Sequence, residues 1–182
     1  MNAALSQLQA EIQQSSPFPS VQEEAVLSIL RTADLIRTAI ANLLAPAAIT
    51  MQQYNVLRIL RGAGSAGLPT LAIGDRMIES APGITRLLDR MEAKGWVSRE
   101  RCKLDRRVVY ARISGEGLRL LAGLDEPLRA STVLSLTGVE ESALGQMIQL
   151  LASVRQSIHP GAAAPTCEGV IGEASPTKSN QT

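Results

Sequence analysis

The chain has 182 residues and a formal net charge of +1, with 45% hydrophobic residues but only 2% aromatic ones. This composition supports one domain with an aliphatic core, and it favours packed helices because Ala and Leu have high helix propensities. Two distant cysteines argue against a disulfide framework, and no apolar run reaches the ~20 residues of a membrane span, so we expect a soluble cytoplasmic protein without a membrane partner.

Residues 1–19 are polar, and we expect them to form a flexible N-terminal arm. A long helix is predicted within residues 20–48, with Ser20 as its N-cap and Glu23 at the spacing of a capping box. Its apolar side chains cover more of the helix surface than burial on one side requires. This breadth indicates a second buried surface, such as a subunit interface, so the segment is interpreted as a dimerisation helix.

Residues 49–113 are predicted to form the next structural unit. Thr50 caps a helix that extends to about residue 61, with Gln53 three residues after the cap. The glycine-rich segment 62–67 is a predicted joint; a phosphate-binding loop is disfavoured because no strand precedes it and no Gly-Lys-Ser or Gly-Lys-Thr follows. A short helix is expected over residues 69–78, and a turn then leads into a second helix.

Positive charge is concentrated in residues 81–112, which contain nine Lys or Arg against four acidic residues. The stretch therefore carries about +5 and the rest of the chain about −4, and such a local basic patch is typical of a protein that binds a phosphate backbone. Pro82 suits the first turn of a helix here, and Gly95 suits the left-handed residue after its end. Side chains at i, i+3, i+4 and i+7 predict the apolar face of this helix: Ile84, Leu87, Leu88 and Met91.

Two short strands are predicted after this helix, over residues 96–101 and 108–113, with a polar tip at 102–107 between them. A basic helix followed directly by a basic hairpin is the layout of a winged helix. Trp96 is expected to pack where the helix meets the hairpin.

The C-terminal part is predicted to be helical again. Ser114 caps a long helix to about residue 136, in which Pro127 should introduce a kink or a break. A last apolar helix is expected over residues 138–158, so residues 114–158 are interpreted as C-terminal dimerisation helices. Residues 159–182 are predicted to be a disordered tail, because Pro, Gly and small polar residues dominate them.

The segments LPTLAIGDRM, ITRLLDRMEAKGWVSRER and LDRRVVYARISGEGLRLL resemble the DNA-binding core of the MarR family of bacterial transcription regulators. The resemblance covers about residues 20–158 and is most specific over 68–121, where helix, Asp-Arg-Arg tip and Ser-x-x-Gly junction occur at the family's spacings. It implies a mainly α fold with a small β-hairpin wing, in which a winged helix-turn-helix domain is flanked by long dimerisation helices. It also implies a homodimer, double-stranded DNA as partner, and a small-molecule effector, which is typical of the family.

The DNA contacts are expected on the second helix of the motif and on the wing. The resemblance implies that Arg107 reaches toward a minor groove, held by Asp105, and that Thr85 and Arg86 touch bases or phosphates. Small residues at 81–83 replace the Ser or Thr that commonly opens this helix, which leaves close backbone approach at Gly83. The predicted DNA-binding residues are Gly83, Thr85, Arg86, Arg90, Arg99, Arg101, Lys103, Asp105, Arg106 and Arg107.

Enzyme chemistry is not expected. His159 is the only histidine, which disfavours most His-dependent catalysis and zinc sites, and no cofactor or metal is predicted. Asp89 and Glu92 are interpreted as charge partners of cations on the same helix rather than as a catalytic pair.

We therefore expect a dimeric DNA-binding transcriptional regulator, with repression of a pseudo-palindromic operator favoured over activation and with release by a ligand. Two alternatives stay open. One is a winged-helix interaction or dimerisation module that does not bind DNA. The other is a redox-responsive regulator that uses Cys102, because the neighbouring cations Arg101 and Lys103 favour a reactive thiolate.

Overall fold

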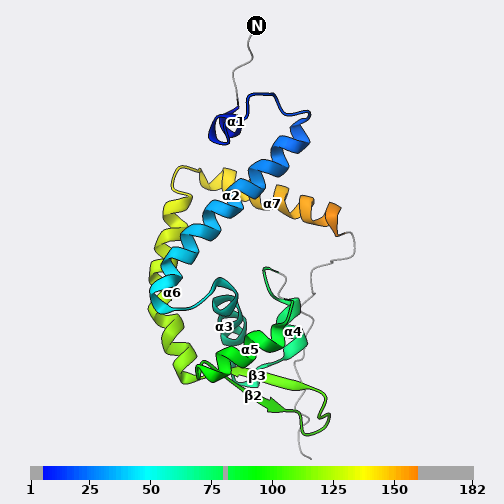
Figure 1. The fold of residues 1–182 in the computed structure, drawn as a ribbon, viewed down its shortest axis with the longest axis vertical. Helices are drawn as coiled ribbons and strands as arrows, with labels where there is room; N and C mark the ends of the chain where they lie inside the picture. The colour runs from blue at the N-terminus through cyan, green and yellow to red at the C-terminus, as the bar shows by residue number, and fades with distance from the viewer. Residues whose placement is uncertain (1–5, 80–81, 160–182) are drawn as a thin grey trace, which may run out of the picture. The chain divides into compact units, whose positions relative to one another are not determined.

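The computed structural model describes residues 6–79 and 82–159, and its contacts divide the chain into two units, residues 1–137 and 138–182. Figure 1 shows a mainly helical chain with one small sheet. The elements of the first unit are α1 (Gln7–Glu11), α2 (Val21–Leu44), η1 (Ala45–Ala47), α3 (Met51–Ala63), η2 (Gly64–Ala66), β1 (Leu68–Pro69), α4 (Thr70–Asp75), α5 (Ile84–Ala93), β2 (Val97–Arg101), β3 (Val109–Ile113) and α6 (Gly115–Ser135). The second unit contains α7 (Glu141–Ile158).

The N-terminal arm contains one short helix. In α1, Ser6 and Gln9 form a complete capping box, and Gln9 Nε2 donates a hydrogen bond to Ser16 O (2.9 Å). The predicted N-cap of α2 is also present, since Ser20 Oγ accepts from Glu23 N (3.2 Å), although only this half of the capping box forms. α2 ends at Leu44, where the 3₁₀ turn containing Pro46 begins.

The predicted caps of α3 are confirmed. Gln53 N donates to Thr50 Oγ1 (3.2 Å), and Thr50 N donates to Gln53 Oε1 (3.0 Å). The helix continues to Ala63, so the joint begins later in the glycine-rich segment than expected. Gly67 has a φ of +67°, and a Cβ atom there would collide with Ala111 O, so a glycine is required for this approach to β3.

The sheet has three antiparallel strands in the order β1-β3-β2. The hairpin lies within the predicted ranges, with Val97 opposite Ile113, but β1 was not predicted. Leu68 pairs with Ala111 and Pro69 with Tyr110, so residue 69 belongs to β1 and not to the expected helix, and α4 has only six residues. Pro69 is tolerated because β1 is an edge strand.

The helix α5 begins later than predicted. Gly83 is its N-cap with a left-handed backbone (φ +90°), so Pro82 lies before the first turn and not within it. The end of the helix is as expected, since Gly95 has a φ of +72°. Trp96 N donates to Met91 O (3.0 Å), and Gly95 N donates to Glu92 O (2.8 Å). These bonds form the Schellman motif, which satisfies carbonyl groups of the last turn.

The long helix α6 begins where predicted, because Ser114 Oγ accepts from Gly117 N (3.0 Å). Pro127 does not break it, and Figure 1 shows one continuous, curved helix. Leu124 and Leu128 on either side of the proline are buried, and we attribute the continuity of the helix to this packing, which offsets the ~3 kcal/mol cost of an internal proline. Of the two outcomes expected at Pro127, the break is therefore wrong, and the kink stays a prediction.

One apolar core lies within the first unit and joins α3, α4, α5, the sheet and α6. The predicted apolar face of α5 contributes three buried side chains to it, and Trp96 packs against its edge where the helix meets the wing, as expected. The buried core residues are Leu44, Ile49, Val56, Leu57, Leu60, Ile73, Leu87, Leu88, Met91, Val97, Ala111, Leu121, Leu124 and Leu128.

In the second unit, α7 begins at Glu141, three residues later than the predicted start, and has no buried residues. The predicted tail from residue 160 onward lies outside the described residues. Among the described helices, none combines the length and the apolar character that crossing a membrane requires.

Candidate nucleic-acid interface

α4 and α5 form the two helices of a helix-turn-helix motif. The segment between them is tied to the helices behind it. Ile78 N donates to Asn55 Oδ1 on α3 (3.0 Å), and Arg37 on α2 pairs with Glu79 (Nε to Oε1, 2.7 Å). These contacts connect residues 78 and 79, which follow α4, to both α2 and α3.

The outer face of α5 is polar and exposed. Leu87, Leu88 and Met91 are buried in the core, which turns Thr85 and Arg86 to the opposite side of the helix. Gly83 and Arg90 are exposed as well, and a Cβ added at Gly83 would meet open space. The structure thus presents one helix face on which the predicted contact residues of α5 are accessible.

Arg99, although a predicted DNA contact, is held within the protein. Its Nη2 lies 2.7 Å from Asp89 Oδ1 and 2.6 Å from Glu92 Oε2, and its backbone N donates to Glu92 Oε1 (3.0 Å). The side chain is only 20% exposed, and hydrogen bonding to Glu92 raises the pKa of Arg99 above its usual value. The partners of Asp89 and Glu92 thus come from β2 and not from α5 itself, which corrects the sequence interpretation. This cluster joins the wing to α5.

The wing tip has an ordered backbone. Asp105 Oδ1 accepts a hydrogen bond from Arg107 N (3.0 Å), Val108 N donates to Asp105 O (3.0 Å), and Cys102 N donates to Val108 O (2.9 Å). The expected pairing of Asp105 with the Arg107 guanidinium is not formed, because this carboxylate closes an Asx turn on the backbone instead. Cys102 is a half-buried free thiol in the hairpin.

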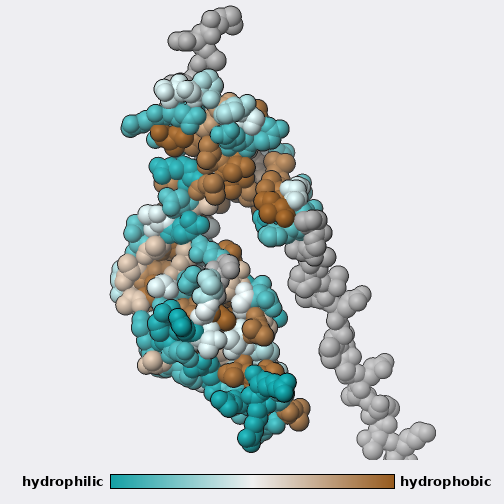
Figure 2. Space-filling model, turned by 45° about the vertical axis from the view of Figure 1, so that its right-hand side comes forward, coloured by the Kyte–Doolittle hydropathy of each residue, from teal (hydrophilic) through white to brown (hydrophobic). Residues whose placement is uncertain are grey.

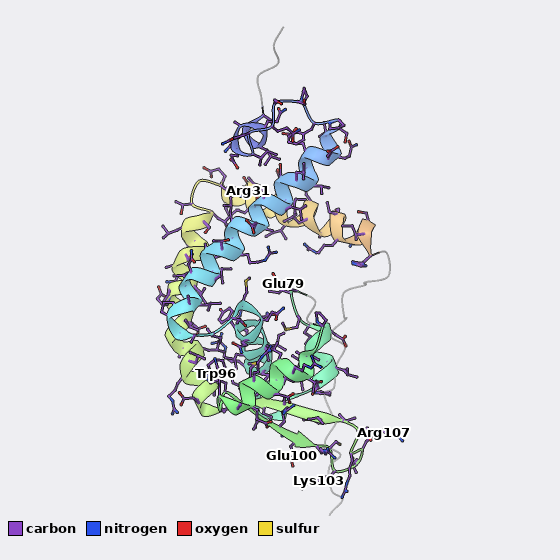
Figure 3. The ribbon with its side chains drawn as sticks, in the orientation of Figure 1. Arg31, Glu79, Trp96, Glu100, Lys103 and Arg107 are labelled. Atoms are coloured by element: carbon purple, nitrogen blue, oxygen red, sulfur yellow. The ribbon has the colours of Figure 1, made fainter. Side chains whose placement is uncertain are left out.

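Cations surround the wing tip. Figure 3 shows Lys103 and Arg107 projecting from the tip and Trp96 at the base of the wing. Figure 2 shows mostly hydrophilic surface at this end of the unit, with some hydrophobic groups beside it. Within the described residues, six cationic side chains of α5 and the wing have no ion-pair partner: Arg86, Arg90, Arg101, Lys103, Arg106 and Arg107.

The other cations of the basic stretch have intramolecular partners. Arg112 pairs with Glu100 (3.1 Å) and donates from Nε to Ser65 O (3.0 Å). Lys94 Nζ lies 4.3 Å from the Trp96 ring centroid and donates to the carbonyl of residue 48 (3.0 Å). A count of charges in the sequence could not distinguish Arg112 and Lys94 from the cations that stay available, because it does not show which groups the folded chain brings next to each cation.

A cavity of about 120 Å³ lies between α2, α3, α6 and the segment after α4. Apolar side chains form much of its lining, and Arg58, Asn55 and Glu79 add polar groups. Through the resemblance, sequence reasoning expected a small-molecule effector but named no residue of its site. Its remaining lining residues are Ile40, Met51, Gln52, Tyr54, Met77, Ile78, Leu128 and Thr132.

Sequence reasoning also missed Leu71, which is 79% exposed on α4 beside the wing. A signal was available, because Leu71 lies two residues before the buried Ile73 and is therefore out of phase with the apolar face of the helix. Among the described residues, no group of three or more His, Cys, Asp or Glu is placed to hold a metal ion.

Comparison with known proteins gives a consistent result. The MarR family model matches residues 49–109. The HTH-type transcriptional regulator TtmR of Methylorubrum extorquens (strain PA1) is 30% identical over 140 residues, which are 77% of this chain and 70% of that protein.

Solved structures agree with this assignment. A MarR transcription factor from Planctomyces limnophilus is 37% identical, with a TM-score of 0.59 over 75% of this chain and 98% of that one. Sco3205, a MarR family transcriptional regulator from Streptomyces coelicolor solved in complex with DNA, has the same fold at 19% identity, with a TM-score of 0.70 over 83% of this chain and 97% of that one. The winged helix-turn-helix geometry and these similarities together show that the chain belongs to the MarR family of transcriptional regulators.

Proposed function

We propose that the chain regulates transcription by binding duplex DNA as a homodimer, with α5 in a major groove and the wing in the adjacent minor groove. The observation that carries this proposal is the set of six available cations on the outer face of α5 and on the wing. Other cations of the wing, Arg99 and Arg112, have carboxylate partners within the protein. Cations left available on one surface match a phosphate backbone, and Sco3205 provides a precedent for the mode of binding.

Each side of the interface has a distinct role in this proposal. Arg86 on α5 is exposed, and its guanidinium is the group suited to a bidentate contact with guanine, whereas Gly83 allows the helix N-terminus to approach the DNA closely. Arg107 extends toward the minor groove from a backbone ordered by Asp105. Arg99 holds the wing in position through Asp89 and Glu92 and does not contact DNA.

Exposed apolar side chains support the homodimer. Isolated apolar residues are common on protein surfaces, but contiguous rows along a helix indicate a protein interface. A two-fold dimer would place its recognition helices roughly 34–36 Å apart on a pseudo-palindromic operator. The exposed apolar residues are Val21, Val26, Ile29, Leu30, Leu35 and Ile36 on α2, and Met147, Ile148, Leu150, Val154 and Ile158 on α7.

The cavity behind the motif supports control by a small molecule. Its apolar lining suits the body of a ligand, and Arg58 and Asn55 suit a polar or anionic group. Asn55 holds Ile78 N, and Glu79 is held by Arg37, so a ligand in the cavity would contact the segment that positions α5. We infer a cytoplasmic repressor that such a ligand releases from DNA.

Salt dependence of DNA binding tests the proposal. Affinity for the duplex upstream of the chain's own gene is measured over a series of salt concentrations, with Arg86→Ala and Arg107→Ala as variants. Each neutralised phosphate contributes about −0.9 to the slope of log K against log salt, so we expect a slope of several units.

The two variants are expected to differ in kind. Arg107→Ala lowers affinity and leaves the base preference of the half-site unchanged, whereas Arg86→Ala relaxes preference at one position by roughly 1–3 kcal/mol. A salt-independent or absent interaction with duplex DNA, in a folded protein, would contradict the proposal and favour an interaction module. A loss of DNA binding on mild oxidation that Cys102→Ser prevents would instead favour the redox alternative.

A further inference from the structure

A groove of about 350 Å³ lies between the start of α4, the start of α5 and the wing. Thr85 of α5 and Arg107 of the wing lie on its walls, and the apolar side chains of Leu71, Val108 and Val109 form much of the rest. This groove of the protein therefore lies between α5, which is proposed to enter the major groove of DNA, and the wing, which is proposed to enter the adjacent minor groove.

Leu71 is the unusual member of this groove. It is 79% exposed, whereas Ile73 of the same short helix is completely buried. The backbone beneath it is fixed, because Thr70 Oγ1 donates to Val109 O (3.1 Å) and β1 pairs with β3. Leu71 is thus presented on a rigid support and contributes little to the core of the protein.

The geometry of duplex DNA determines which part of the DNA would lie in this groove of the protein. A single sugar-phosphate strand separates a major groove from the adjacent minor groove, so a protein that occupies both grooves must accommodate that strand between its two elements. The strand has anionic phosphates and, between them, the C–H face of each deoxyribose. Arg107 suits the phosphates, and Leu71 with Val108 suits the sugars.

We propose that Leu71 is a DNA contact whose side chain packs against a deoxyribose of the strand between the two grooves. The assignment rests on the proposed function, which places α5 and the wing on the same duplex. Contacts to sugars carry no sequence information, and an apolar contact releases no counterions. Leu71 therefore adds affinity that depends neither on sequence nor on salt.

The test compares the wild-type chain with Leu71→Ala, Leu71→Met and Arg107→Ala. Affinities are measured on two duplexes of equal length, the region upstream of the chain's own gene and an unrelated sequence, over a series of salt concentrations. Thermal melting of each variant is expected to match the wild type, because both side chains are exposed.

Leu71→Ala is expected to bind both duplexes roughly fivefold more weakly, since each fully buried methylene contributes up to about fourfold. Its salt slope should equal that of the wild type, and Leu71→Met should restore the affinity. Arg107→Ala, which changes a charged lining residue of the same groove, should instead reduce the salt slope.

Unchanged affinity of Leu71→Ala would overturn the assignment. So would a loss of its affinity that is accompanied by a shallower salt slope or that occurs on only one duplex. Failure of Leu71→Met to restore binding would overturn it as well. If the wild-type chain binds neither duplex, the proposed function fails instead, so the two failures are distinguishable.

Discussion

Asp105 orders the wing tip by accepting a hydrogen bond from the backbone of Arg107. Its Oδ1 lies 3.0 Å from Arg107 N, and the carbonyl of the same aspartate accepts from Val108 N, so one residue fixes both ends of the turn. The side chain of Arg107 leaves this turn without an ion pair among the described residues. The ordered backbone consequently fixes the point at which this side chain leaves the turn, and the guanidinium stays available for an external anion.

Substitution of Asp105 separates backbone ordering from charge. Asp105→Ala removes the acceptor and should weaken DNA binding as Arg107→Ala does, and the double variant should be less than additive, with a coupling energy of about 0.5–3 kcal/mol. Asp105→Asn keeps an acceptor oxygen and should bind nearly as the wild type. Affinities of the wild type, the two alanine variants and the double variant for operator DNA give this double-mutant cycle. Independent contributions of Asp105 and Arg107 would show that the Asp105 turn does not act on DNA binding through Arg107. Binding by Asp105→Asn as weak as that of Asp105→Ala would show the same.

At the scale of elements, the junction between α5 and β2 determines the orientation of the wing relative to α5. Arg99 bridges Asp89 and Glu92, and Glu92 also accepts from the backbone of β2. Hydrogen bonding to Glu92 raises the pKa of Arg99, so its guanidinium stays charged throughout the physiological range. The stabilisation from that charge is complete below the pKa of arginine in the unfolded chain, and it is lost only as pH rises through the still higher pKa of Arg99 in the folded protein.

Arg99→Met is expected to lower the free energy of unfolding by about 1–2 kcal/mol. Charge-assisted hydrogen bonds contribute ~1.5–3 kcal/mol each, but partial exposure of the two carboxylates reduces this value. Urea denaturation measures the change, and Arg101→Met in the same strand is the control, since Arg101 is exposed and has no ion pair among the described residues. Equal destabilisation by both substitutions would contradict the role assigned to Arg99.

Two glycines of α6 give a second test at this scale. A Cβ atom at Gly117 would collide with the backbone oxygen of Trp96, whereas nothing lies within 4 Å of a Cβ at Gly123. Gly117→Ala should therefore destabilise the protein, and Gly123→Ala should stabilise it by roughly 0.5–1 kcal/mol, because alanine has the higher helix propensity. Thermal melting compares them. A stabilising Gly117→Ala would mean that the close approach of α6 to the backbone of Trp96 is not required.

At the scale of the whole molecule, the single chain leaves much apolar surface exposed on α2 and α7. Within α2 only Leu44 is buried, and α7 has no buried residue. The core of the first unit is complete without these faces, so their apolar character has no explanation in the fold of that unit. A homodimer in which they are covered accounts for them, and its stability would then depend on protomer concentration.

Truncation before Val139 tests the dimer. Removal of α7 should leave the proposed partner surface on α2 exposed, so we expect an aggregated or unstable product rather than a folded monomer. Sedimentation velocity and thermal melting, compared with the full chain, measure the outcome. A soluble truncated monomer that melts cooperatively would contradict the proposed interface.

Local sequence determined the elements whose signals lie within a few residues of one another. The capping box of Thr50 and Gln53, the apolar face of α5 and the left-handed Gly95 were all predicted and are all present. Such features depend on hydrogen bonds and packing between neighbours three or four positions apart, which a sequence displays directly. The charge count of residues 81–112 identified the candidate interface for the same reason.

The tertiary structure decided whatever depends on a partner that is distant in the chain. β1 exists because residue 68 meets Ala111, and α6 continues through Pro127 where its flanking leucines are buried. Arg99 and Arg107 look equivalent in the sequence, but only Arg99 meets carboxylates of another element. Which cations remain available, and whether Leu71 is exposed, are set by these long-range contacts, because local periodicity and charge do not specify which elements will pack together.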